Sequence, residues 1–213
     1  MSKTGNFSGM VKLGLVLACF ATAACVMLAF VYSGTAKIIA LRQQADLENS
    51  LKDLFPDADS FREVSDIESP DPSVSIEKQY AALRNGERIG AALRLSRASY
   101  GGPIKVLVGV GAGGKIAGVK ILEHSDTPGL GANAASGSYF VDRAGGITFY
   151  GQFAGKSVND PFKVKDDVAA ITASTVTSSA VSAAVRAAGL GAAAWLDGTE
   201  AGAVSGATEG GAQ

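Results

Sequence analysis

A run of twenty residues without a charged side chain, Leu13 to Tyr32, constrains this 213-residue chain most strongly. Lys12 and Lys37 stand on either side of it. A helix needs about 20 apolar residues to cross the hydrocarbon core of a bilayer. The sequence therefore predicts a transmembrane helix over residues 13–33, held in membrane lipid, after a short tail of residues 1–12.

Two alternatives to an uncleaved span are weaker. A signal peptide usually has an apolar region of only about 7–15 residues. Thr22-Ala23-Ala24-Cys25 loosely resembles a lipoprotein cleavage site, but Thr22 stands where a large aliphatic residue is wanted and the sequence stays apolar beyond Cys25. Lysines on both sides leave the orientation undetermined by charge. The simplest arrangement retains the short N-terminal tail in the cytoplasm and exports the long domain.

The rest of the chain lacks the motifs of a conventional enzyme. Both cysteines, Cys19 and Cys25, lie inside the apolar run, so the body has no thiol nucleophile, zinc site or disulfide framework. The net charge is −1, and the absence of a basic patch argues against nucleic acid as the main partner. No phosphate-binding loop, zinc-protease motif or nucleophile elbow occurs. We therefore expect no independent catalytic site and no metal site.

Between the span and the folded domain we expect a linker helix and then an acidic connector, together residues 34–78. Apolar residues recur at helical spacing from Ala36 to Phe55, and Pro56 interrupts the pattern. The carboxylates between residues 56 and 74 lack the spacing of a calcium-binding loop. This segment is therefore predicted to be a solvated connector.

From Gln79 onward the pattern is that of a sheet. Runs rich in Val and Ile, at 104–110 and 115–124, flank the glycine-rich segment Gly111–Gly114, and Asn85-Gly86 is a dipeptide typical of hairpin turns. We predict an α+β domain over residues 79–196, with a mostly antiparallel sheet, hairpins at these two glycine positions, and helices at both ends.

One motif in this region points to a different fold. Gly109, Gly111 and Gly114 match the dinucleotide-binding fingerprint of a parallel α/β sheet. That fingerprint needs a helix next, on whose N-terminus the pyrophosphate sits. The next segment here, from Lys115 to Ile121, has the pattern of a second strand. We therefore interpret the glycines as a hairpin and reject the dinucleotide fold.

A dense group of hydroxyls precedes an alanine-rich run between residues 171 and 189. Its seven members are Thr172, Ser174, Thr175, Thr177, Ser178, Ser179 and Ser182. Val181 and Val185 follow four residues apart, and Gly189 closes the run, as in a capped helix that ends at glycine. A helix N-terminus also presents unpaired N–H groups and a positive dipole end. The stretch therefore either caps an ordinary helix or binds a phosphate.

Three further features accompany it. The loop Thr127-Pro128-Gly129-Leu130-Gly131 combines a fixed proline φ angle with glycines that let a ligand approach the backbone. His124, the only histidine, is at a strand end, where a structural role is more common than a catalytic one. Lys156 is a candidate to bring positive charge to a phosphate. The Gly- and Ala-rich residues 197–213 are predicted to form a disordered tail.

Taken together, the motifs resemble those of a flavoprotein family. Three motifs carry the resemblance: His-x-Asp-Thr-Pro-Gly-Leu-Gly over 124–131, Gln-Phe-x-Gly-Lys over 152–156, and Ile-Thr-x-x-Thr-x-Thr-Ser over 171–178. They are similar to motifs of the flavin-binding G subunit of the Rnf electron transport complex, with Asp126 in place of that family's Glu. They are also similar to motifs of the C subunit of the sodium-pumping NADH:quinone oxidoreductase. The resemblance covers the whole plan of the chain, from the N-terminal span to the hydroxyl-rich helix start.

This resemblance implies a function. In that family FMN is joined through its phosphate to a threonine, and a membrane-external flavin transferase attaches it. The flavin relays electrons one at a time within a membrane complex that couples redox chemistry between ferredoxin and NAD to movement of Na⁺ or H⁺. We therefore expect covalent FMN and, as partners, other subunits of a Rnf-type complex. We also expect a single-pass protein of the cell membrane with its soluble domain on the outer face.

The resemblance also implies site residues. The modified threonine is the last residue of a [Ser/Thr]-Gly-Ala-Thr motif, which by position is Thr175. Contacts on the phosphate side are expected from four hydroxyls, those of Thr172, Ser174, Thr177 and Ser178, with Lys156 nearby. Contacts with the isoalloxazine ring are expected from the loop residues Thr127, Pro128, Gly129, Leu130 and Gly131.

The chain departs from the family pattern at the attachment motif. Ala173 and Ser174 stand where the motif has Gly and Ala, and Ala169 stands where an Asp usually precedes it. The literal Ser-Gly-Ala-Thr occurs instead in the tail and ends at Thr208, also without the preceding Asp. Thr175 is preferred because only there does a helix N-terminus supply N–H groups to a phosphate. Thr208 is the alternative.

The altered motif leaves a second hypothesis open, a membrane-anchored flavin-binding or sensory module without covalent FMN. In both hypotheses the flavin, rather than a catalytic side chain, carries the chemistry. The predicted span contains no Asp, Glu, Lys or Arg, so an ion path is not expected to run through it.

Overall fold

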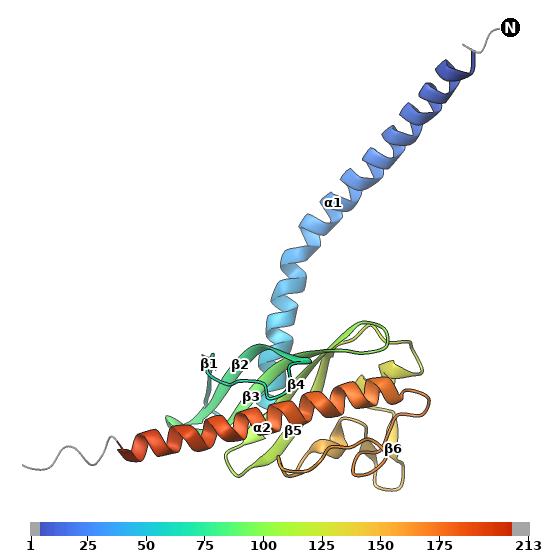
Figure 1. Ribbon diagram of the computed structural model, residues 1–213. Coiled ribbons are helices and arrows are strands. Elements are labelled where there is room, and N and C mark those ends of the chain that lie inside the picture. The colour runs from blue at the N-terminus through green and yellow to red at the C-terminus, as the bar shows by residue number, and fades with distance from the viewer. Residues whose placement is uncertain (1–4, 206–213) are drawn as a thin grey trace, which may run out of the picture. The chain divides into compact units, whose positions relative to one another are not determined.

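The computed structural model describes residues 5–205 of the chain. It divides into two compact units, Met1–Glu48 and Asn49–Gln213. Helix α1, Gly5–Leu54, makes up the first unit and ends in the second (Figure 1). α1 is long and apolar enough to cross a membrane, and its apolar segment is not buried against other parts of the protein. The predicted linker helix is confirmed, since α1 continues unbroken to the residue before Phe55 and Pro56.

The second unit is built on a five-stranded antiparallel sheet in which each strand pairs with the next in sequence. Its strands are β1 (Ser60–Val64), β2 (Val74–Arg84), β3 (Glu87–Ala98), β4 (Pro103–Gly111) and β5 (Lys115–Glu123). The α+β class is confirmed, as are both hairpins. Asn85 and Gly86 both have positive φ, 52° and 83°, as the turn between β2 and β3 requires. β5 runs antiparallel to β4 after the glycines, so rejecting the dinucleotide fold was correct.

β1 corrects the prediction of a solvated connector over residues 56–74. Its residues Ser60–Val64 pair in register with β2 at the sheet edge. Only Phe61 and Val64 are partly buried along this strand. These two residues are three apart, so the strand lacks the alternation of apolar and polar residues that marks a half-buried strand in sequence.

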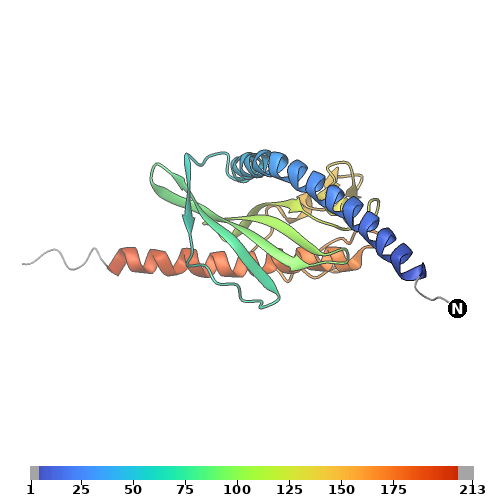
Figure 2. The same cartoon turned by 90° about the horizontal axis from the view of Figure 1, so that it is seen from above.

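Helix α2, Thr175–Ser205, packs along one face of this sheet (Figures 1 and 2). Its buried side chains include Val181, Ala184, Val185, Ala188 and Ala192. They meet alternate residues of the central strands, among them Leu93, Leu95, Val106, Val108 and Val110. Thr175–Gly198 also has the length and apolarity of a membrane span, but most of it is buried in this core.

We expected α2 to end at Gly189, but the helix continues through this residue to Ser205. A Cβ atom there would make ordinary contacts, 3.4 Å from Val158 and 3.5 Å from Ile116, and packing of the buried face of α2 against the core carries the helix through the glycine. Residues 197–205, the first part of the predicted disordered tail, continue α2 as helix. Alanine is the strongest helix former, and extending an existing helix needs no new nucleus. Thr208 lies outside the described residues.

Short elements connect β5 to α2. They are the 3₁₀ turns η1 (Gly131–Ala135) and η2 (Gly151–Phe153), and the two-stranded pair β6 (Phe140–Asp142) and β7 (Ile147–Thr148). Phe149 and Phe153 meet edge to face, with ring centroids 5.7 Å apart. Both rings are fully buried and fix this irregular segment to the core.

Three glycines on the sheet face turned away from α2 receive the end of α1. Alternate residues of a strand point to opposite faces, so Gly90, Gly109 and Gly118 lie opposite the core. A Cβ at Gly90 would lie 2.6 Å from the Phe55 ring and 2.5 Å from the Val110 carbonyl oxygen. Phe55 is 6% exposed. Gly109, which matches the dinucleotide-binding fingerprint, therefore makes room for the Phe55 ring instead.

We expect Gly90→Ala to lower the free energy of unfolding by about 1–3 kcal/mol, because both the ring and the carbonyl would have to move. Urea unfolding of the detergent-solubilised chain, followed by fluorescence of the sole tryptophan, Trp195, measures this loss. Gly113→Ala is the control, since a Cβ there meets nothing within 4 Å. An equal loss of unfolding free energy in both variants would contradict the conclusion that Gly90 makes room for Phe55.

Candidate functional site

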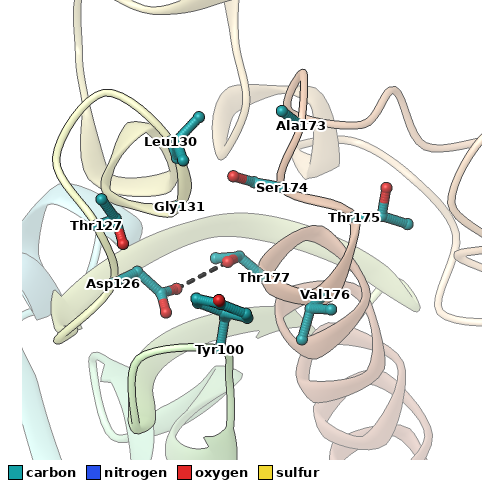
Figure 3. Close-up of a pocket in the computed structure, with 10 residues that line it drawn as sticks. All are labelled: Tyr100, Asp126, Thr127, Leu130, Gly131, Ala173, Ser174, Thr175, Val176 and Thr177. Carbon is teal, nitrogen blue, oxygen red and sulfur yellow. Dashed lines mark hydrogen bonds between the residues drawn. The ribbon is translucent and has the colours of Figure 1, made fainter.

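A pocket of about 510 Å³ opens where three segments of the second unit meet: the turn after β3, the loop after β5 and the start of α2 (Figure 3). Its lining residues are Tyr100, Asp126, Thr127, Leu130, Gly131, Ala173, Ser174, Thr175, Val176 and Thr177. The two segments that sequence analysis singled out thus lie side by side. Three apolar or aromatic residues around the pocket are largely exposed: Tyr100 at 79%, Val176 at 55% and Leu130 at 42%.

The carboxylate of Asp126 joins these three segments. Its Oδ2 accepts hydrogen bonds from the Thr177 hydroxyl of α2 at 2.8 Å and from the Ser99 hydroxyl at 2.7 Å. Its Oδ1 accepts the Gly101 N–H of the β3–β4 turn at 2.6 Å. Asp126 is only 6% exposed. Hydrogen bonds to an ionised group are about twice as strong as neutral ones, so this carboxylate fixes the pocket walls to one another.

The hydrogen bonds also keep Asp126 ionised. Burial alone would raise the pKa of the carboxyl, but the bonds from Ser99, Gly101 and Thr177 outweigh it and hold the pKa below its ordinary value of 3.8. Each donor stabilises the charged form. The pocket therefore contains a permanent negative charge at neutral pH.

Two glycines make room for this carboxylate. A Cβ at Gly101 would lie 2.2 Å from the Ser125 carbonyl oxygen. A Cβ at Gly131 would lie 2.6 Å from both Asp126 Cβ and Thr177 Oγ1. From the sequence we expect Gly131 to let a ligand approach the backbone closely. The close approach seen here is to protein groups of the Asp126 network.

Side chains hold the irregular segment that leads into α2. Gln152 accepts the Ala169 N–H at 2.7 Å and donates to the Ala169 carbonyl at 3.1 Å. The Tyr139 hydroxyl accepts the Thr172 N–H at 3.1 Å. The Ser178 hydroxyl accepts the Ile171 N–H and donates to the Ser174 carbonyl, both at 2.9 Å. The residues before the helix are therefore fixed in place without regular secondary structure.

The start of α2 has free polar groups. The Ser178 N–H donates to the Ser174 carbonyl at 3.0 Å, so Ser174 is the N-cap and the first-turn N–H groups have no partner within the helix. The hydroxyls of Ser174 and Thr175 make no hydrogen bond to any described residue. In Figure 3 the Ser174 hydroxyl points toward the Thr127–Gly131 loop, whereas the Thr175 side chain extends from the other side of the backbone.

The structure brings only some of the expected site residues to the pocket. Thr127, Leu130, Gly131, Ser174, Thr175 and Thr177 line it. Five others are not among the described lining residues: Pro128, Gly129, Lys156, Thr172 and Ser178. The Lys156 ammonium donates instead to the Asp167 carbonyl at 2.7 Å. His124 does not line the pocket, and its Nδ1 is buried without a partner in the described part of the chain.

Tyr100, Val176 and the role of Asp126 were not predicted from the sequence. Asp126 lies within a recognised motif and beside two glycine-containing segments, which was a usable signal. Tyr100 and Val176 had none, because a single exposed apolar side chain is ordinary on a protein surface. They become notable only when the fold places them on one pocket.

The backbone conformation at position 173 favours glycine, the residue that the resemblance leads us to expect there. Ala173, at that glycine's position, has a φ of +58°. This left-handed conformation costs a residue with a Cβ about 1–2 kcal/mol, and glycine avoids that cost.

Known proteins share both the domain and the plan of this chain. The FMN-binding domain matches residues 99–189 and the RnfG N-terminal region matches residues 1–54. The G subunit of the proton-translocating ferredoxin:NAD(+) oxidoreductase complex of Clostridium ljungdahlii is 31% identical over 172 residues, 78% of this chain and 82% of that protein. The G subunit of the Na(+)-translocating complex of Acetobacterium woodii is 30% identical over 187 residues, 80% and 85% of the two chains. The G subunit of the ion-translocating oxidoreductase complex of Cereibacter sphaeroides is 32% identical over 162 residues, 72% and 69%.

Asp126→Ala is expected to lower the free energy of unfolding by about 3 kcal/mol at neutral pH, since it leaves three donors without their acceptor. Because the folded pKa lies below 3.8, this stabilisation is present above that value and is lost as the pH falls through the folded pKa. The difference between wild type and variant should therefore shrink below about pH 4. Asp57→Ala, at an exposed carboxylate, is the control and should change stability by less than about 0.5 kcal/mol. A difference that is independent of pH would contradict the charged network.

Ala173→Gly is expected to raise the free energy of unfolding by up to about 1 kcal/mol, because relief of the left-handed strain exceeds the entropy that glycine adds to the unfolded chain. The same change at Ala183, inside α2, should lower it by about 0.5–1 kcal/mol. Thermal unfolding of the two variants checks these opposite signs. A loss at both positions would show that residue 173 is unstrained.

Proposed function

Since this chain belongs to the RnfG family, the G subunits of Rnf-type ion-translocating oxidoreductase complexes, we propose that it carries FMN for electron transfer within such a complex. One observation supports this most directly: the pocket joins the Thr127–Gly131 loop to the start of α2 inside the segment that matches the FMN-binding domain. The relatives are named as subunits of ferredoxin:NAD(+) oxidoreductase complexes. This chain acts as one subunit among several and has no catalytic site of its own.

The pocket residues fit a flavin. A volume of about 510 Å³ lies within the range of about 300–1,000 Å³ usual for small-ligand sites. Tyr100, Leu130 and Val176 offer apolar and aromatic surface to a flat ring, and covering them explains why such side chains stand exposed together. The Thr127 and Ser174 hydroxyls supply polar contacts at the edge. A bound FMN supplies one-electron chemistry, and these residues orient it and exclude water from its ring.

Thr175 is the residue that would hold FMN, through an ester between its hydroxyl oxygen and the flavin phosphate. The Thr175 side chain is exposed, so a flavin transferase has access to it. Thr175 is also the first residue of α2, beside N–H groups and a positive dipole end that stabilise an anion. Thr172 and Ser178 serve a different purpose from the expected phosphate contacts, because their groups hold the segment before the helix. Lys156 is likewise engaged with Asp167.

The remaining partners follow from the family. α1 anchors the protein in the membrane in a single pass, and the flavin domain lies on the outer face, where the transferase acts. Other subunits of the complex deliver and remove the electron, and the complex as a whole couples this transfer to movement of Na⁺ or H⁺. A second candidate, a membrane-anchored module with noncovalent flavin, is favoured by the altered residues Ala173 and Ser174.

Co-expression with a flavin transferase, followed by acid precipitation, tests the attachment. Flavin fluorescence should remain in the pellet for wild type and Thr208→Ala, and should vanish for Thr175→Ala. Its loss in Thr208→Ala alone would move the site to the C-terminal tail. Its absence from wild type would support the noncovalent alternative.

A further inference from the structure

The proposed flavin pocket has an unusual charge for a site that receives a phosphate. None of its described lining residues is a Lys, Arg or His. Its one charged group is the carboxylate of Asp126, which three hydrogen bonds keep in place. Sites that bind free phosphate groups usually pair them with Arg or Lys. This pocket presents an anion instead.

The cations nearest in sequence are committed elsewhere or lie off the pocket. Lys156 donates to the Asp167 carbonyl and lies 3.6 Å from the Asp167 carboxylate. Lys163 lies 3.9 Å from Asp166, with both side chains largely exposed. Lys165, the cation nearest in sequence to Thr175, is exposed and does not line the pocket. Arg143 is not a lining residue of the pocket; hydrogen bonds with Thr172 lower the pKa of the Tyr139 phenol, and the charge of Arg143 adds to this. The positive element that remains is the start of α2, worth about half a charge.

The two chemical forms of FMN place different demands on such a site. A free phosphate monoester carries about −1.5 to −2 charges at pH 7. A phosphate esterified to a threonine is a diester with a single negative charge. A helix N-terminus balances one charge better than two, and the Asp126 carboxylate repels either form. The pocket therefore suits the attached form and disfavours the free one.

We propose that this pocket recognises the isoalloxazine ring and not the phosphate, so that the ester bond, rather than a phosphate clamp, retains FMN. This inference rests on the proposed function. The pocket accepts flavins whether or not they carry a phosphate. Protein without attached FMN therefore binds riboflavin at least as well as it binds FMN. Tyr100, Leu130 and Val176 provide that binding through contact with the ring.

Flavin fluorescence quenching tests the preference. The full-length chain is produced without a flavin transferase, solubilised in detergent, and titrated with riboflavin and with FMN at about 10 mM and about 150 mM salt. The dissociation constant for FMN should equal or exceed that for riboflavin. Any excess should shrink at the higher salt, where the Debye length falls from about 30 Å to about 8 Å.

A matched pair of variants sharpens the test. Val176→Lys places a cation at the first turn of α2, whereas Val176→Gln adds a polar chain of similar reach without charge. Relative to riboflavin, FMN binding should tighten in Val176→Lys by roughly two- to fivefold, the strength of one partly exposed charge pair. Both substitutions remove an apolar ring contact and should weaken the binding of both flavins, so the readout is the ratio of the two dissociation constants, which should differ from wild type only in Val176→Lys.

The outcomes separate this inference from the proposed function. If FMN binds wild type more than about threefold tighter than riboflavin, a phosphate clamp exists and the inference is wrong, while the flavin site stands. If neither flavin binds but co-expression still yields covalent flavin, recognition of the ring is wrong and the attachment stands. If neither flavin binds and none is attached, the proposed function itself fails.

Discussion

The Asp126 carboxylate accepts hydrogen bonds from groups that are far apart in the sequence, and the pocket walls meet because they share it. Gly101 reaches it from the β3–β4 turn, and Thr177 reaches it from the first turn of α2. A Cβ at position 101 or 131 would lie 2.2 Å from the Ser125 carbonyl oxygen or 2.6 Å from Asp126 Cβ and Thr177 Oγ1, so these groups would have to shift. The buried charge therefore sets the position of the helix start, of its free N–H groups, and of the residue proposed to carry the flavin.

The sequence predicted those features that depend on local pattern. The apolar run, the Asn85-Gly86 turn and the two candidate site segments follow from residue types at fixed spacing, and the fold confirms the hairpins and brings the two segments together. It did not predict features set by tertiary packing. β1 can be recognised only from its pairing with β2, and Gly189 resembles a helix stop until α2 is seen packed against the sheet. Lys156 donates to the Asp167 carbonyl and does not line the pocket, a contact that residue spacing in the sequence does not reveal.

Glycine and alanine show why motif residues need a structure for their interpretation. Gly109 matched a nucleotide-binding pattern, but its lack of a side chain makes room for Phe55. Gly131 matched a ligand loop and also makes room for Asp126. Ala173 departs from a motif glycine, yet its φ of +58° keeps the conformation that glycine would adopt. The altered motif thus preserves the backbone conformation of the proposed attachment site, which favours Thr175 over a position chosen by sequence alone.

Tryptic peptide mapping of the flavinylated wild-type protein tests the central claim most directly. Cleavage after Lys165 and Arg186 separates a peptide of residues 166–186, which contains Thr175, from residues 187–213, which contain Thr208. Flavin fluorescence and the added FMN mass should follow the 166–186 peptide, on Thr175. Flavin on the 187–213 peptide would contradict this assignment, because the pocket at the start of α2 would then not be the site of attachment.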